Sequence, residues 1–296
     1  MKNNINLSPV HVTVHSDNTK MEGLKSTSTS TKCNKQCRKN MLIEGSICQK
    51  CFADSTLDRR DYLALALERN YNLLTTRILE DHEVLRLNDL YHRFEAFGDL
   101  ANTTQFINYI NMCNANPHTM FAIWTKNPHI MSEVLNDMQV EKPKNLIIVV
   151  SSLFLNVEWK YKNLPYANKY WFIDKVFTVY TADYAIKNNI KINCGNKKCL
   201  QCKLCYTHNN ITVINEIIKS QANTYYNTLA MLNDYKEWLQ ENELQHNAET
   251  LETYISSLYY ELCDSYEGKH ENWYKWIKTQ EKKIKKTILK YIEYVL

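Results

Sequence analysis

Eight of the ten cysteines in this 296-residue chain stand in two tight quartets. The first quartet has the spacing C-x3-C-x10-C-x2-C and the second the spacing C-x4-C-x2-C-x2-C. Their members are Cys33, Cys37, Cys48 and Cys51 in the first quartet, and Cys194, Cys199, Cys202 and Cys205 in the second. Clustered thiolates are the ligands of tetrahedral zinc and of iron–sulfur clusters. The sequence therefore predicts that all eight thiols bind metal.

The second quartet favours a [4Fe–4S] cluster over zinc. Its run C-x2-C-x2-C is typical of iron–sulfur proteins, in which successive thiolates reach different irons of one cube. Cys194 is then available as the fourth ligand. The first quartet suits either metal, because zinc ribbons are also built from C-x2-C pairs. Two separate cubes, one larger assembly shared by both quartets, and structural zinc at both quartets are the alternatives that the spacing leaves open.

An aromatic residue directly follows the last cysteine of each quartet: Phe52 in the first and Tyr206 in the second. Aromatic rings beside a cluster shield it from water and tune its reduction potential, and plain core packing is the alternative. The two remaining cysteines are Cys113, on an apolar helical face, and Cys263, in a helical tract. We expect both to be core residues.

Four polar residues near predicted strand ends are candidates for catalysis or ligand binding: Arg93, Glu95, Asp99 and Lys126. Side chains two apart in a strand share a face, so we expect Arg93 and Glu95 to point together into a barrel mouth. Lys126 is a candidate anion ligand. For Arg93, Glu95 and Asp99, the alternative is a buried ion pair or an aspartate that only caps a loop. The histidines form no H-E-x-x-H pattern, so a hydrolytic zinc site has no support.

Strand and helix patterns alternate through most of the chain. Helices are predicted over residues 57–79, 102–113 and from 127 to about 138, and strands over residues 91–97, 119–125, 145–153 and 175–181. Such alternation with buried strands predicts an α/β fold with a parallel sheet and right-handed crossovers. A partial or complete (β/α) barrel is favoured over an open sheet, because polar residues punctuate the strand ends where active sites of these folds lie.

Two domains are predicted. Residues 1–218 form a barrel-like domain that carries both quartets, and residues 219–296 form a helical C-terminal extension. The segment 277–290 holds six lysines and one glutamate beside an apolar stripe. A basic amphipathic helix of this kind is a candidate contact for nucleic acid, and a solvated lysine face over a packed stripe is the alternative. The run from Ser26 to Cys33 is predicted as a loop leading into the first quartet.

Composition excludes several classes of protein. The net charge of +4 is modest, and only five glycines are present where a typical composition of roughly 7% gives about twenty. Neither G-x-G-x-x-G nor a Walker loop can be built from them. No stretch approaches the ~18 apolar residues of a membrane span, and no signal peptide is recognisable. We therefore expect a cytoplasmic protein without a membrane partner, whose reduced thiols favour metal over disulfides.

Several motifs together resemble a known family. They are S-T-S-T followed by I-C-x-x-C-F-A, then R-F-E-A-F-G-D-L-A-N, F-A-I-W-T-K-N, N-L-I-I-V-V-S-S, D-K-V-F-T-V-Y and I-N-C-G-x-x-x-C-x-x-C-x-x-C-Y. In this order they resemble the phage and prophage family called gene-product-88-like, from about Met21 to Ile218. The resemblance implies a phage protein that acts in the cytosol of the host cell.

The Cys-aromatic-Ala element is also similar to radical S-adenosylmethionine enzymes. That resemblance implies a partial (β/α) barrel with residues 10–14 as strand one and the first quartet as the cluster loop. It makes Glu95 to Asp99 comparable to the acidic strand-end segment that contacts the methionine moiety of S-adenosylmethionine. Radical enzymes use C-x3-C-x2-C, whereas ten residues separate Cys37 from Cys48 here. If all four thiolates bind one cube, no iron stays open for S-adenosylmethionine.

The leading functional hypothesis is a phage-type iron–sulfur protein on a radical-enzyme-like scaffold, active in redox or cluster-dependent chemistry on an unknown substrate or with a redox partner. The alternative is a non-catalytic interaction protein that is stabilised by two zinc sites of four cysteines each. In that case its C-terminal helices would contact nucleic acid or a host protein.

Overall fold

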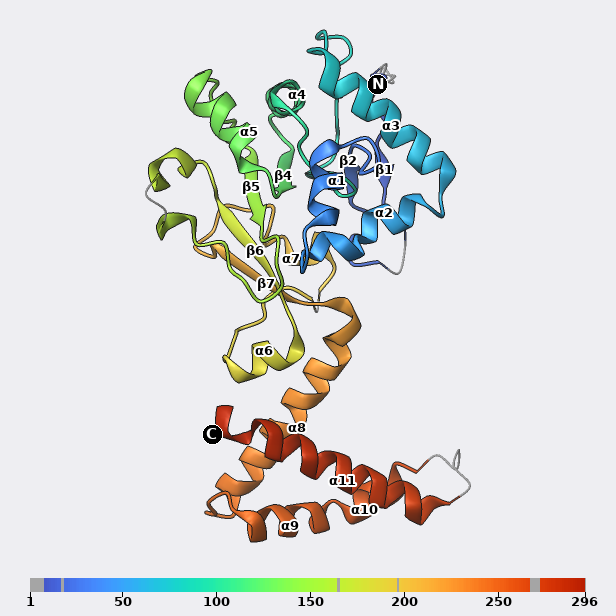
Figure 1. The fold of residues 1–296 in the computed structure, drawn as a ribbon, viewed down its shortest axis with the longest axis vertical. Coiled ribbons are helices and arrows are strands. Elements are labelled where there is room, and N and C mark those ends of the chain that lie inside the picture. The colour runs from blue at the N-terminus through green and yellow to red at the C-terminus, as the bar shows by residue number, and fades with distance from the viewer. Residues whose placement is uncertain (1–7, 17–18, 164–165, 196, 267–271, 296) are drawn as a thin grey trace. The chain divides into compact units, whose positions relative to one another are not determined.

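A computed structural model of the chain describes residues 8–16, 19–163, 166–195, 197–266 and 272–295 (Figure 1). The described chain is a mixed α/β protein with a seven-stranded sheet and many helices. It divides into two compact units. The first comprises Met1–Val179 and Asn193–Glu216, and the second comprises Tyr180–Ile192 and Ile217–Leu296.

The strands follow one another in the sheet in their order along the chain, as in an open sheet. They are β1 (Thr13–Val14), β2 (Lys25–Thr27), β3 (Tyr91–Phe94), β4 (Met120–Thr125), β5 (Leu146–Ser151), β6 (Lys175–Tyr180) and β7 (Val213–Ile217). The short β1 is antiparallel to β2, and the pairs from β2 to β6 are parallel. Because parallel strands all end at one edge, the segments that follow β2, β3, β4 and β5 meet there.

The helices include the long elements that the sequence pattern predicts. They are α1 (Lys35–Leu42), α2 (Phe52–Leu57), α3 (Asp61–Thr76), α4 (Thr103–Ala115), α5 (Pro128–Ser132), α6 (Ala182–Lys187), α7 (Cys199–Cys202), α8 (Ala222–Glu241), α9 (Ala248–Ser257), α10 (Tyr259–Asp264) and α11 (Trp273–Tyr291). Shorter turns of helix are η1 (Ile47–Lys50), η2 (Glu133–Asp137), η3 (Tyr161–Asn163), η4 (Ala167–Tyr170), η5 (Lys219–Gln221) and η6 (Ile292–Tyr294). Asn102 caps α4, as predicted, by accepting a hydrogen bond from the amide of Gln105 at 3.0 Å.

The predicted strands over 119–125, 145–153 and 175–181 are confirmed as β4, β5 and β6. Every residue of β5 is buried, as expected for a strand covered on both faces. The predicted strand over 91–97 ends early, because Glu95 has a φ of 55° and cannot continue an extended chain.

The N-terminal strand prediction is wrong in part. Of residues 10–14, only Thr13 and Val14 form a strand, and they add an antiparallel edge. The first parallel strand is β2, which includes the start of the run for which the sequence pattern predicts a loop. Residues 26–31 are all buried although each is serine or threonine. Their polar character hides the strand from a reading based on apolar patterns.

Different elements cover the two faces of the sheet. One face presents Phe94 to a core that includes Leu74 of α3, Phe106 of α4 and Met131 of α5. The opposite face has the cross-strand row Arg93–Ala122–Ile147. The apolar members of this face pack against Tyr206 and the segment that contains the second quartet. The sheet therefore places that quartet against its second face.

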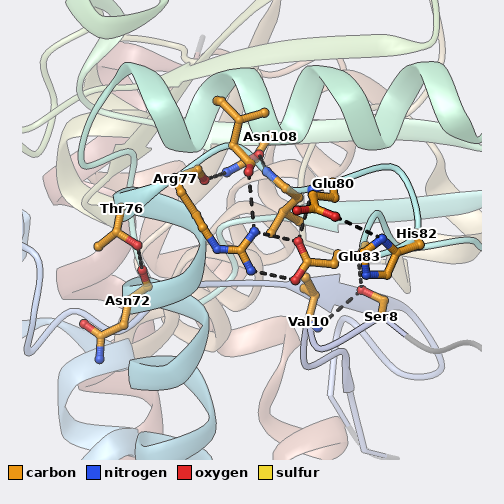
Figure 2. Close-up of polar contacts among 11 residues, drawn as sticks. Ser8, Val10, Asn72, Thr76, Arg77, Glu80, His82, Glu83 and Asn108 are labelled. Atoms are coloured by element: carbon orange, nitrogen blue, oxygen red, sulfur yellow. Dashed lines mark hydrogen bonds and ion pairs between the residues drawn. The ribbon is translucent and has the colours of Figure 1, made fainter.

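The connection from α3 to β3 is held by polar contacts (Figure 2). Arg77 donates two hydrogen bonds of 2.6 Å to the two carboxylate oxygens of Glu83. The side chain of Asn108, on α4, donates to the carbonyls of Leu74 and Arg77 and accepts from the amide of Leu79. These bonds fix the loop that precedes β3, the strand that carries Arg93 and ends directly before Glu95.

The second unit is largely helical. Its core includes Ile288 and Tyr291 from the apolar stripe predicted for the last helix, and Ile284 packs against that core. The stripe prediction is therefore confirmed for α11. Within the described residues, no helix has both the length and the apolar character that crossing a bilayer requires.

Candidate metal centres

The first quartet lies on the segment that directly follows β2. Cys33 precedes α1, Cys37 lies in its first turn, Cys48 is in η1, and Cys51 stands at the start of α2. Asn34 caps α1 by accepting hydrogen bonds from the amides of Gln36 and Cys37, at 2.9 and 3.3 Å. A cap here explains why the helix begins between the first two cysteines.

The ten residues between Cys37 and Cys48 bridge to a distant part of the sheet edge. The amide of Ile47 donates to the carbonyl of Leu153 at 2.9 Å, and Ser46 forms a β-bridge with Phe154. The segment after β2 thus reaches the segment after β5. The ten residues between Cys37 and Cys48, which distinguish this quartet from a C-x3-C-x2-C loop, allow the chain to reach the segment after β5.

Three thiols of the first quartet lie in one another's electrostatic field. Burial raises the pKa of Cys37 strongly, and Asp99, Glu95, Cys51 and Cys48 raise it further. Burial also raises the pKa of Cys48, Lys126 lowers it, and Cys51 raises it. The pKa of Cys33 is raised by burial and by Glu68. Three of the four predicted polar candidates, Glu95, Asp99 and Lys126, are therefore gathered with this quartet.

Glu95 is a fully buried carboxyl group with a dense set of donors. It accepts hydrogen bonds from the amide and hydroxyl of Thr29 and from Gln105, the last at 2.6 Å, and the hydroxyl of Tyr109 also donates to it. Burial raises its pKa to about 8 despite these donors. The lack of a side chain at Gly98 makes room for the Glu95 carboxyl group. A Cβ at this position would lie 2.5 Å from the carbonyl oxygen of Thr29 and closer still to the carboxylate of Glu95.

Asp99 joins the ends of two strands. Its carboxylate accepts from the hydroxyl of Thr125 at 2.5 Å and from the amides of Leu100 and Lys126 at 2.8 and 2.9 Å. Its backbone carbonyl accepts from the side chain of Asn34 at 2.7 Å. Burial raises the pKa of Asp99, and Lys126 opposes that rise. Asp99 therefore caps the loops after β3 and β4, which is the alternative predicted for it from the sequence, and it does so beside Cys37 of the first quartet.

Arg93 lies apart from Glu95, against the expectation that the two share a face. The positive φ of Glu95 turns its side chain out of the strand alternation. Arg93 instead stacks on Trp124, with its guanidinium carbon 3.9 Å from the ring centroid. Its charge lowers the pKa of Cys199 and of Cys205. Arg93 therefore belongs with the second quartet.

The four thiols of the second quartet share one electrostatic neighbourhood. Burial is the largest of the causes that raise the pKa of Cys205, and Cys194, Cys199 and Cys202 raise it further. The helical turn α7 spans Cys199 to Cys202, and Lys203 follows with a left-handed φ of 55°. Cys199, at the start of this turn, and Cys205, after it, pack against the sheet face.

Lys20 contacts the segment that carries the second quartet through both its side chain and its backbone. Its ammonium group donates to the sulfur of Cys194 at 2.8 Å and lies 2.6 Å from the carboxylate of Glu216. Its carbonyl accepts from the amide of Cys199 at 2.8 Å. Neither Lys20 nor Glu216 was predicted, because only the fold brings residues so far apart in sequence to the quartet.

Two buried donors beside the second quartet lack an acceptor among the described residues. They are the Nε of Arg93 and the hydroxyl of Tyr206. Tyr206 is 2% exposed, and its pKa is raised by burial and by Cys199, Cys205 and Cys194. Buried donors without acceptors are costly and rare in native proteins. An anionic group rich in sulfur at this quartet would supply the missing acceptors.

The two aromatic residues behave differently. Tyr206 packs at its quartet as predicted, whereas Phe52 is 62% exposed and cannot shield the first quartet as expected. Cys113 is fully buried in the core, and Cys263 is only partly buried in α10. The expectation of a core position is thus confirmed for Cys113 alone.

As folded here, no group of three or more His, Cys, Asp or Glu side chains in the described parts of the chain has an arrangement that could hold a metal ion. A single tetrahedral zinc, with Zn–S bonds of about 2.3 Å, needs sulfurs within about 4 Å of one another. A cube needs wider spacing, since each thiolate binds its own iron. The donor chemistry of the second quartet fits such a cluster, with its four thiols, adjacent cations and unsatisfied donors.

Comparison with known proteins gave one assignment. The family model described as gene product 88 matches residues 9–203, which include all of the first quartet and Cys194, Cys199 and Cys202 of the second. No curated protein and no solved structure matches the chain.

Proposed function

The chain belongs to the gene product 88 family of phage proteins, and we propose that this member is an iron–sulfur protein whose clusters are held by its two cysteine quartets. The proposal rests chiefly on the second quartet. There, the four thiols interact electrostatically with one another and with two cations, Lys20 and Arg93. The hydroxyl of Tyr206, which has no acceptor among the described residues, lies beside them.

The charges explain what this chain contributes to binding. Four thiolates together with inorganic sulfide carry net negative charge, which is costly to bury unless it is paired. Lys20 and Arg93 supply compensating charge at the second quartet. Because burial raises the pKa of the free thiols, binding metal must release protons from them. The role proposed for a bound cluster is to exchange electrons.

The first quartet would hold a second cluster through Cys37, Cys48 and Cys51, with Cys33 as the remaining ligand. Its surroundings are more polar, with Asp99 nearby. A substrate or redox partner would reach it at the sheet edge, because Cys48 and Cys51 are only partly buried. The barrel-like closure predicted from the polar strand ends and the binding of S-adenosylmethionine implied by resemblance both stay predictions, and the proposal does not depend on them.

Metal and sulfide analysis of anaerobically purified protein tests the proposal. We expect a brown protein with broad absorption near 400 nm, and iron and acid-labile sulfide in near-equal amounts. The double variant Cys199→Ser/Cys202→Ser should lose the iron of the second quartet and keep that of the first. Cys263→Ser is the matched control, since this cysteine lies outside both quartets, and it should keep the full iron content.

A colourless protein with stoichiometric zinc would refute the proposal and favour the alternative, an interaction protein with two structural zinc sites. The observation that favours a nucleic-acid contact for that alternative is on α11. Its residues Lys282, Lys283 and Lys286 are exposed, and within the described chain they form no ion pair. Replacing these three by glutamine should then weaken binding to DNA and reduce its salt dependence.

A further inference from the structure

We propose that Lys20 raises the reduction potential of the centre at the second quartet, acting as a positioning residue through its bond to the Cys194 sulfur. This inference rests on the proposed function and deepens it, because it assigns the residue that tunes one of the two clusters. The contacts of Lys20 that carry it belong to the chain itself.

The geometry of Lys20 is unusual for a lysine. Its ammonium group is 2.8 Å from the Cys194 sulfur, and its side chain is 24% exposed. The carboxylate of Glu216 lies 2.6 Å away from the same ammonium group. A backbone bridge pairs Glu216 with Cys194, so the ammonium group is held in place by two fixed partners. The cation lies directly against the sulfur and the carboxylate binds the cation.

Two further cations lie near the same quartet. Arg93 lowers the pKa of Cys199 and Cys205 by its charge. Lys175 is 2% exposed and interacts electrostatically with Cys205. Its ammonium group donates to the side chain of Asn209 and to the carbonyl of Ile211, at 2.9 and 2.8 Å, so it is also fixed. Of the three cations, Lys20 alone donates a hydrogen bond to a ligand sulfur within the described chain.

The electrostatic argument follows from the charge of a reduced cluster. Reduction adds one negative charge, and a fixed cation or a hydrogen bond to a ligand sulfur stabilises the reduced form more than the oxidised form. Partial burial preserves this effect, because solvent and salt screen the pair only weakly. Removing the ammonium group should therefore make the centre harder to reduce, and removing the carboxylate of Glu216 should make it easier.

A potentiometric titration of the anaerobic full-length protein, followed by electron paramagnetic resonance, measures this effect. The signal of the second centre is the one that the variant Cys199→Ser/Cys202→Ser lacks. In Lys20→Met we expect the ratio of oxidised to reduced centre at a fixed potential to rise about tenfold, a shift of about 59 mV for a one-electron couple. Lys20→Arg keeps the charge and should recover most of the shift.

Two other variants make the test decisive. Glu216→Gln should shift the potential in the opposite direction, and it decides the matter if Lys20→Met fails to assemble the centre. Lys198→Met is the matched control, because this lysine precedes Cys199 but pairs with Glu22 and is 47% exposed. It should leave the potential unchanged.

The outcomes separate the inference from the proposed function. Wild-type protein without iron and sulfide overturns the proposed function. Fully loaded wild-type and Lys20→Met proteins with equal potentials overturn the inference and leave the iron–sulfur assignment intact. If Lys20→Met and Lys198→Met shift the potential equally, general surface charge is responsible and the specific role of Lys20 is also overturned.

Discussion

Glu95 shows how one backbone angle decides where a functional side chain lies. Its φ of 55° ends β3 and turns the carboxyl group away from the face that carries Arg93. The carboxyl group is then surrounded by donors from Thr29, Gln105 and Tyr109. The side-chain alternation expected from the sequence pattern failed here because that pattern contains no information on a left-handed residue.

The raised pKa of Glu95 predicts a pH-dependent stability. The folded protein holds the proton up to about pH 8, whereas the unfolded chain loses it near its ordinary value of 4.5. The folded state therefore binds more protons between these values, and the free energy of unfolding should fall as pH rises through this window. Urea titrations of metal-free Glu95→Gln should show a smaller fall, with about 1.4 kcal/mol per pKa unit setting the scale.

Glu83→Gln is the control for that experiment. Its hydrogen bonds with Arg77 lower the pKa of Glu83 to about 2, so its contribution is present above about pH 4.5 and is lost only as pH falls toward 2. The fall between pH 5 and 8 should be the same as in the wild-type protein. An equal slope in the Glu95→Gln protein would show that this carboxyl group does not titrate as described.

Gly98 gives a second prediction at the scale of a residue. A methyl group at this position would overlap the Thr29 carbonyl and the Glu95 carboxylate. We expect Gly98→Ala to cost about 1–3 kcal/mol of stability through overpacking. Gly45→Ala is the matched glycine substitution in open space, although its φ of 74° adds backbone strain of its own. Equal or smaller destabilisation by Gly98→Ala in chemical denaturation would contradict the close approach.

At the scale of elements, α1 is the helix that orders the first quartet. The side chain of Asn34 caps α1 and also donates to the carbonyl of Asp99. One residue thus connects the helix that carries Cys37 to the loop that follows β3. The sequence pattern predicts no helix over this segment, because the short α1 lacks a long apolar stripe.

The cap of α1 can be tested against a cap elsewhere. We expect Asn34→Ala to reduce stability by about 1–2 kcal/mol and to reduce iron bound at the first quartet. Asn247→Ala removes the capping-box residue of α9 in the second unit and should cost similar stability without loss of iron. Metal analysis beside thermal denaturation measures both effects. Equal iron content in the two variants would mean that α1 does not organise the site.

At the scale of the whole molecule, the two quartets have different electrostatic surroundings, although each also has a group of the other sign beside it: Lys126 near Cys48 and Glu216 near Cys194. The carboxyl groups of Glu95 and Asp99 face the first quartet, and the charges of Lys20 and Arg93 face the second. Both quartets lie in the first compact unit. We therefore propose two centres of different character rather than a single shared assembly.

This contrast predicts an order of reduction potentials. Above about pH 8, where Glu95 joins Asp99 as a carboxylate, the centre at the first quartet should have the lower potential, because these negative charges disfavour the added negative charge of the reduced form. Stepwise reduction of the full-length protein should therefore reduce the second centre first. A single signal that disappears when either quartet is removed would show instead that the quartets hold one shared assembly.

The sequence alone determined the eight thiols, the parallel α/β pattern and the helical C-terminal stretch, because spacing and hydrophobic periodicity are local properties. The tertiary structure alone decided that Arg93 lies with one quartet and Glu95 with the other. It also decided that Lys20 meets Cys194, and that a run of serines and threonines begins as a strand and is buried throughout. These depend on contacts between distant segments and on one backbone angle, neither of which local sequence patterns encode.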